Sequence, residues 1–187
     1  MSDDEPAQPM AGHPEPLNAA TAFPSTDEHN DLSVDSFSES VSMLFENAPR
    51  FAAWLAAARP FEADAELMAA AARIAQQMAE EDKVELVNAH PRLGARDRLS
   101  AASEREQGGT PDPVDVELAG LNASYEMRFG FRYLVYVAGR SRGDLLPEFR
   151  AALRGDRDAE LHRALDDTLA IAADRLRWFR SPTSEDA

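Results

Sequence analysis

From about residue 32 onward, apolar side chains recur three and four positions apart, the spacing of one face of an α-helix. Residues 131–139, FRYLVYVAG, are instead typical of a strand because they are rich in aromatic and β-branched side chains. No second stretch could pair with them, so we predict a buried extended segment within an all-α, single-domain helical bundle. The helices are predicted over residues 36–45, 50–59, 64–80, 115–129, 142–153 and 157–179, with a short one around 84–87.

The first 31 residues have a different composition, with five prolines, seven acidic residues and neither lysine nor arginine. Such a segment buries too little apolar surface to offset the entropy lost on ordering it. We therefore predict a disordered acidic tail over 1–31, a folded domain over 32–180 and a flexible C-terminal tail over 181–187. A solvating tail is favoured over a docking segment.

Composition narrows the possible functions. A chain of 187 residues can form one domain with a proper core. It has no cysteine, which excludes disulfides, thiolate metal sites and cysteine nucleophiles. The net charge is −15 with no basic patch, unlike proteins that bind the phosphate backbone. With no secretory or membrane-spanning pattern either, we expect a cytoplasmic protein with no nucleic-acid or membrane partner.

His90 is the most informative side chain among the four histidines. His13 and His29 belong to the predicted tail, and His162 lies on a charged part of the last helix. Pro91 disfavours helical conformation at His90, so the imidazole should lie at a helix end, where it can face a cleft and exchange a proton. The alternative is a histidine that only caps backbone carbonyls, and spacing alone favours that alternative.

A polar run follows at SEREQ, residues 103–107. Ser103, Glu106 and Gln107 together offer donors and acceptors for a ureido or amide group. Equally, Ser103 and Glu106 fit an S-x-x-E capping box. The sequence shows neither the ligand spacing of a metal site nor a phosphate-binding glycine loop, so we expect no metal and no cofactor.

The ordered motifs together resemble the OHCU decarboxylase family, which acts on 2-oxo-4-hydroxy-4-carboxy-5-ureidoimidazoline. The resemblance covers roughly residues 32–180. The motifs are RPF at 59–61, HPRLG at 90–94, SEREQ at 103–107, NASY at 122–125, RFGF at 128–131 and GRS at 139–141.

The resemblance implies an all-α homodimer, a carboxy-lyase of urate degradation that converts OHCU into (S)-allantoin without a cofactor. It implies that His90 is the catalytic acid/base and that Glu106, also catalytic, orients the substrate together with Gln107. The remaining substrate-binding residues that it implies are Pro91, Ser103, and the backbone of Phe131, Arg132, Tyr133, Leu134 and Val135.

Two departures from the family pattern affect this interpretation. Arg132 stands where many members have proline. Ala152 and Gly155 stand where the family shows the arginine and asparagine of an Arg-Leu-x-Asn motif, which could alter substrate or partner contacts. Arg150 and Arg154 lie nearby but at different spacing.

An anionic substrate would need local cations in this acidic chain, and the candidates are Arg92, Arg96 and Arg132. Two other hypotheses remain open. One is a decarboxylase of the same fold for another small carboxylated ring, and the other is a non-catalytic acidic helical interaction module.

Overall fold

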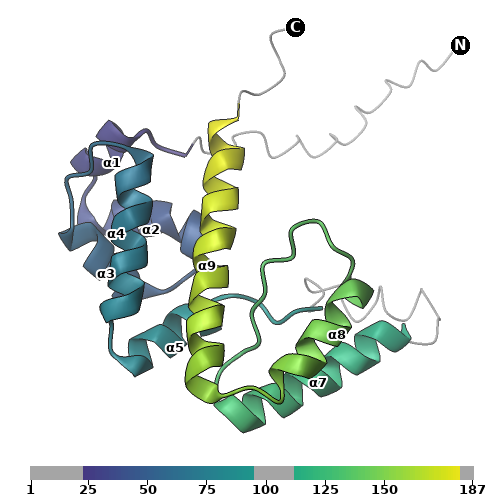
Figure 1. The fold of residues 1–187 in the computed structure, drawn as a ribbon. Helices are drawn as coiled ribbons and strands as arrows, with labels where there is room; N and C mark the ends of the chain where they lie inside the picture. Colours follow the sequence, from purple (N-terminus) through teal and green to yellow (C-terminus); the bar gives the residue numbers. More distant parts are fainter. Residues whose placement is uncertain (1–22, 95–111, 182–187) are drawn as a thin grey trace, which may run out of the picture.

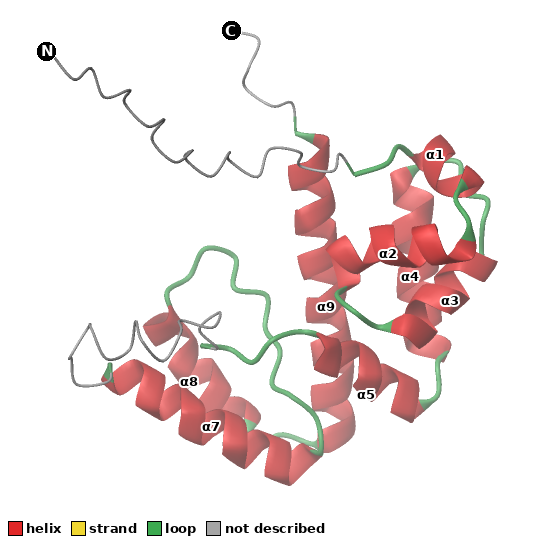
Figure 2. Ribbon diagram, turned by 180° about the vertical axis from the view of Figure 1, so that it is seen from behind, coloured by secondary structure: helices red, strands yellow, loops and turns green. Residues whose placement is uncertain are grey.

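The computed structural model describes residues 23–94 and 112–181, and within these ranges the chain forms helices and loops without any strand (Figure 2). This confirms the predicted all-α fold. The helices are α1 (Thr26–Asp31), α2 (Val34–Phe45), α3 (Pro49–Ala57), α4 (Asp64–Gln77), α5 (Glu80–Ala89), α7 (Pro113–Phe129), α8 (Arg142–Ala152) and α9 (Arg157–Arg180).

The long helix α9 is the centre of the architecture. It stands between the group formed by α1 to α5 and the pair formed by α7 and α8 (Figure 1). Helices α2, α4 and α5 pack directly on it, while α7 and α8 pack on each other. One face of α9 is buried along its length, through Leu161, Ala164, Leu165, Thr168, Ala172 and Leu176. The apolar periodicity of this helix therefore predicted its contact face.

The segment after α7 is extended and buried, as predicted. Gly130 ends α7 with φ +80°, a left-handed conformation that glycine adopts without strain. Phe131 and Tyr133 are then buried, and the Tyr133 ring stacks on Phe149 of α8 with 3.7 Å between centroids. Aromatic content thus indicated burial here rather than pairing in a sheet.

The predicted boundary of the N-terminal tail is wrong for residues 23–31, which pack against the domain. Phe23 is buried and stacks on Phe179 of α9, with ring centroids 5.1 Å apart. His29 on α1 is fully buried, and its Nε2 lies 2.7 Å from the Ser40 hydroxyl. Arg180 donates to the Phe23 carbonyl at 3.0 Å. The acidic composition of the whole stretch obscured two aromatic anchors, Phe23 and His29, which pack on α9 and α2. Residues 1–22 and 182–187 lie outside the described ranges.

No described helix is both long enough and apolar enough to cross a membrane.

Replacing Phe23 by alanine should lower the free energy of unfolding by about 3 kcal/mol, since it removes a buried ring and leaves a cavity. Chemical denaturation measures the change. Met127→Ala is the control because Met127 is 88% exposed and its loss should matter little. Equal stability of Phe23→Ala and the wild type would contradict the packing of residues 23–31.

Candidate active site

His90 ends helix α5 in the backbone conformation that the following proline imposes. Its φ and ψ are −74° and 147°, which is extended rather than helical. The side chain is only 2% exposed, and its Nε2 has no hydrogen-bond partner within the described ranges. The ring therefore does not cap any described carbonyl, and of the two alternatives for His90 the structure supports the one in which the ring faces a cleft.

A cavity of about 210 Å³ adjoins His90. Its walls are the turn at residues 90–94, the extended segment from Tyr133 to Val137, and Ile171 and Arg175 of α9. The Tyr133 hydroxyl, like Nε2 of His90, is buried without a partner among the described residues. Buried polar atoms normally have partners, so two such atoms on residues that line one cavity indicate a place for a polar ligand.

The structure brings together half of the predicted site residues. Those that line the cavity are His90, Pro91, Tyr133, Leu134 and Val135. Phe131 and Arg132 are not among its described lining residues, and the Arg132 side chain binds main-chain carbonyls instead. Ser103, Glu106, Gln107 and the candidate cation Arg96 lie outside the described residues.

Arg175 is the cation that the sequence analysis missed. It reaches the cavity wall from α9, and its Nη1 donates to the Leu44 carbonyl at 3.0 Å. Its Nη2 pairs with the Glu46 carboxylate. Glu46 itself ends α2 at φ +60°, a backbone conformation that residues other than glycine rarely adopt. A possible signal was the position of Arg175 beside the apolar stripe of α9, directly before the buried Leu176.

Burial determines the charge state of His90. Desolvation, followed by the nearby Arg175 charge, lowers the pKa of His90 to about 4, while Glu46 opposes the shift. The imidazole is therefore neutral at neutral pH in the unliganded protein. A neutral ring can accept a proton or a hydrogen bond from a ligand in the cavity.

The turn after His90 is fixed on helix α7. Arg92 binds the Glu126 carboxylate through two nitrogens, at 2.5 and 2.7 Å. The Asn122 amide donates to the Leu93 carbonyl at 2.9 Å. Gly94 has φ +80°, and a Cβ there would lie 2.8 Å from Leu118 Cδ1, so only glycine fits without displacement. The HPRLG and NASY motifs thus meet in space.

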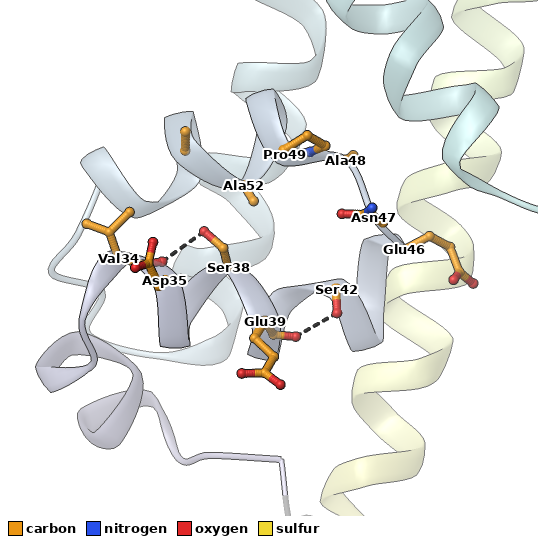
Figure 3. A pocket seen from close by; sticks show the side chains of 11 residues that line it. Val34, Asp35, Ser38, Glu39, Ser42, Glu46, Asn47, Ala48, Pro49 and Ala52 are labelled. Carbon is orange, nitrogen blue, oxygen red and sulfur yellow. Dashed lines mark hydrogen bonds between the residues drawn. The ribbon is translucent and has the colours of Figure 1, made fainter.

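A larger hollow of about 620 Å³ lies between α2 and α3 (Figure 3). Its Ser38 and Ser42 hydroxyls donate to the main-chain carbonyls of Val34 and Glu39, at 2.8 and 2.6 Å. No described side chain that lines it has a buried polar atom without a partner. The smaller cavity beside His90 is therefore the better candidate for an active site.

The second departure from the family pattern lies away from this cavity. Ala152 is buried at the end of α8, and Gly155 lies in the turn before α9, where a Cβ would come within 3.0 Å of the Glu160 carboxylate. Neither residue lines the cavity beside His90. The loss of the arginine and asparagine at these positions therefore changes the α8–α9 turn rather than the described walls of the site.

Comparison with known proteins decides the family. A family model described as OHCU decarboxylase matches residues 30–177. The chain belongs to the OHCU decarboxylase family.

Individual relatives of the OHCU decarboxylase family agree with this assignment. A 2-oxo-4-hydroxy-4-carboxy-5-ureidoimidazoline decarboxylase of Haloferax volcanii is 30% identical over 152 residues, which cover 79% of this chain and 90% of the relative. The uric acid degradation bifunctional protein PucL of Bacillus subtilis is 30% identical over 155 residues, but this chain spans only 31% of its length. A crystal structure of OHCU decarboxylase in the presence of (S)-allantoin has the same fold, with a TM-score of 0.61 and 21% identity, over 77% of this chain and 99% of that one.

Because the pKa of His90 is lowered in the folded state, the free energy of unfolding of this OHCU decarboxylase family member should depend on pH. Between pH 6.5 and 4 the unfolded chain binds more protons than the folded one, so the free energy of unfolding falls as the pH drops. From pH 7 to pH 5.5 this contribution should amount to about 1 kcal/mol.

Denaturation of wild type and His90→Asn at both pH values measures the effect. Burial also lowers the pKa of His29, so only the difference between the two proteins isolates His90. A histidine-selective NMR titration should place the His90 midpoint well below 6.5. Parallel pH profiles for both proteins would contradict the predicted shift.

Proposed function

We propose that this protein decarboxylates OHCU to (S)-allantoin without a cofactor, with His90 as the acid/base. The single observation that carries the proposal is a cavity lined by both Arg175 and His90, a buried histidine whose Nε2 has no hydrogen-bond partner among the described residues. Family membership supplies the substrate class, because the matching relatives are named for this reaction or for uric acid degradation.

Binding of the substrate carboxylate requires a local positive charge. The chain as a whole carries −15, which repels anions at long range. Arg175 supplies a guanidinium at the cavity wall, and its side chain is fixed by Glu46 and the Leu44 carbonyl. Arg92 also lines the cavity and is likewise paired with a carboxylate, Glu126, but its side chain is 52% exposed, against 33% for Arg175, and only Arg175 lies close enough to His90 to lower its pKa. We therefore assign the substrate carboxylate to Arg175.

The proton step follows from the charge of the bound substrate. A carboxylate close to His90 raises the imidazole pKa, so substrate binding favours the protonated ring. The bond between C4 and its carboxylate then breaks, CO2 leaves, and the electron pair moves toward the neighbouring C=N bond, which gives a C4=C5 double bond and a negative charge on the ring nitrogen. His90 gives its proton to C5, the carbon that carries the ureido group, while the C4 hydroxyl proton passes to the ring nitrogen and leaves C4 as a carbonyl. His90 then takes another proton from solvent, which balances the reaction. Delivery from one side of the cavity would yield one enantiomer.

Glu106 and Gln107 complete the proposal. They lie outside the described residues, so their part in holding the ureido group remains a prediction from the sequence, as does the homodimer.

His90→Asn should lower kcat for freshly prepared OHCU by about 100-fold or more, since a positioned acid/base contributes roughly that factor. The decay of substrate absorbance and the circular dichroism of the allantoin formed measure it. His162→Asn is the control because His162 is an exposed histidine bound to the Asp158 carbonyl. Racemic allantoin at the spontaneous rate with the wild-type protein would disprove the proposed function.

Arg175→Met should lower kcat/KM by about 10- to 100-fold, the loss of one charged hydrogen bond to substrate. Arg177→Met is the matched control, since Arg177 lies on the same helix, is largely exposed and forms a salt bridge with Asp174. Steady-state kinetics distinguish the two variants. Equal kcat/KM for Arg175→Met and wild type would show that another group binds the carboxylate.

A further inference from the structure

We propose that Arg132 is a positioning residue that holds the end of helix α5 and so fixes the direction of the His90 imidazole, without touching the substrate. The inference rests on the proposed function, because it assigns the reacting group to His90. It gives the Arg132 side chain a different role from that of a cation that binds the anionic substrate, for which Arg132 was one of the candidates in the sequence.

At the end of α5 the His90 N–H donates to the Val87 carbonyl at 3.3 Å, but the carbonyls that follow need donors from elsewhere in the chain. Pro91 has no N–H to donate back into the helix, and the last turn of α5 contains no basic residue. Arg132 supplies the missing donor: its Nη1 donates to the Asn88 carbonyl at 2.6 Å and to the His90 carbonyl at 2.8 Å. A cation at this end also complements the helix dipole.

A second contact ties the same two segments in the opposite direction. The backbone N–H of Arg132 donates to the Asn88 side-chain oxygen at 2.8 Å. The residues on either side of Arg132 are anchored as well, because Phe131 is 1% exposed and Tyr133 is fully buried. The buried extended segment therefore fixes the position of Arg132, and the Arg132 guanidinium in turn fixes the C-terminal end of α5.

The three hydrogen bonds that join Arg132 to Asn88 and His90, here called the Arg132 clamp, fix the backbone of His90, and the backbone sets the direction in which the ring projects. The described residues offer no partner to Nε2, so no described side chain orients the imidazole through that nitrogen. The backbone of His90 is instead fixed on one side by Arg132, and the turn that follows is fixed by Arg92 and Asn122 on α7. Misplacing an acid by about 1 Å can cost roughly 100-fold in rate, so loss of the clamp should reduce the chemical step.

The position of Arg132 argues against a direct substrate contact. It is not among the described residues that line the cavity, whereas Arg175 is. Its Nη1 is engaged by two main-chain oxygens. A positioning role predicts that kcat falls while KM changes little, whereas loss of a binding contact with the substrate predicts a rise in KM at nearly constant kcat.

The test compares Arg132→Met and Arg132→Lys in the full-length protein. Arg132→Met should lower kcat about tenfold or more and change KM less than twofold. Arg132→Lys should recover part of kcat, because a single nitrogen already makes both contacts and an ammonium can donate to two carbonyls.

Arg59→Met is the matched control. Arg59 Nη1 likewise donates to main-chain carbonyls around the end of α1, those of His29 and Leu32, at 3.0 and 2.6 Å. Its loss should lower Tm and leave kcat unchanged. If Arg132→Met does not fold, Asn88→Ala removes one contact of the clamp and should lower kcat in the same direction by a smaller factor.

A readout without substrate separates this inference from the proposed function. In histidine-labelled protein, the His90 ring resonances should shift or broaden in Arg132→Met and stay in place in Arg59→Met. A wild-type protein that leaves OHCU untouched would disprove the proposed function, while the NMR comparison would still test the clamp. Unchanged His90 resonances, or a rise in KM at constant kcat, would overturn the positioning role.

Discussion

Burial of one face of helix α9 is the constraint on which the rest of the structure depends. The α1–α5 group packs on that face, and arginines of the same helix bind carbonyls of three other segments. Arg163 donates to the Leu134 carbonyl at 2.8 Å, Arg175 to that of Leu44 at 3.0 Å, and Arg180 to that of Phe23 at 3.0 Å. Helix α9 therefore orders the extended segment, the end of α2 and the N-terminal residues at once, and the cavity beside His90 lies between α9, the extended segment and the turn at residues 90–94.

The candidate site is built from helix ends. Helix α5 ends at His90 and α2 ends at Glu46, and both leave carbonyls that the helix cannot satisfy by itself. In each case an arginine from a distant part of the chain supplies the donors, Arg132 for α5 and Arg175 for α2. Because guanidinium groups satisfy the backbone, the imidazole of His90 remains without a described partner and is available to a ligand. In this region Arg132 and Arg175 therefore stabilise the backbone, while His90 remains available for the reaction.

Much of the fold and part of the site could be predicted from the sequence. The helices from α2 onward follow the apolar period, and the non-helical backbone at His90 follows from Pro91. The aromatic run at 131–135 correctly indicated a buried extended segment. The beginning of the domain was misplaced, because Phe23 and His29 are aromatic anchors within an acidic composition and their partners lie on α9 and α2. Arg175 was missed because its partner Glu46 is 129 residues away.

The sequence by itself determined what depends on neighbouring residues: the helical periodicity, the break at His90–Pro91, and the order of motifs typical of the family. Only the tertiary structure decided which charges meet. Arg132 binds the end of α5 rather than the cavity, and Arg175 rather than Arg132 lines the wall beside His90. The physical reason is that local steric preferences act over a few residues, whereas an ion pair or a capping hydrogen bond depends on distances that are fixed only when the helices pack together.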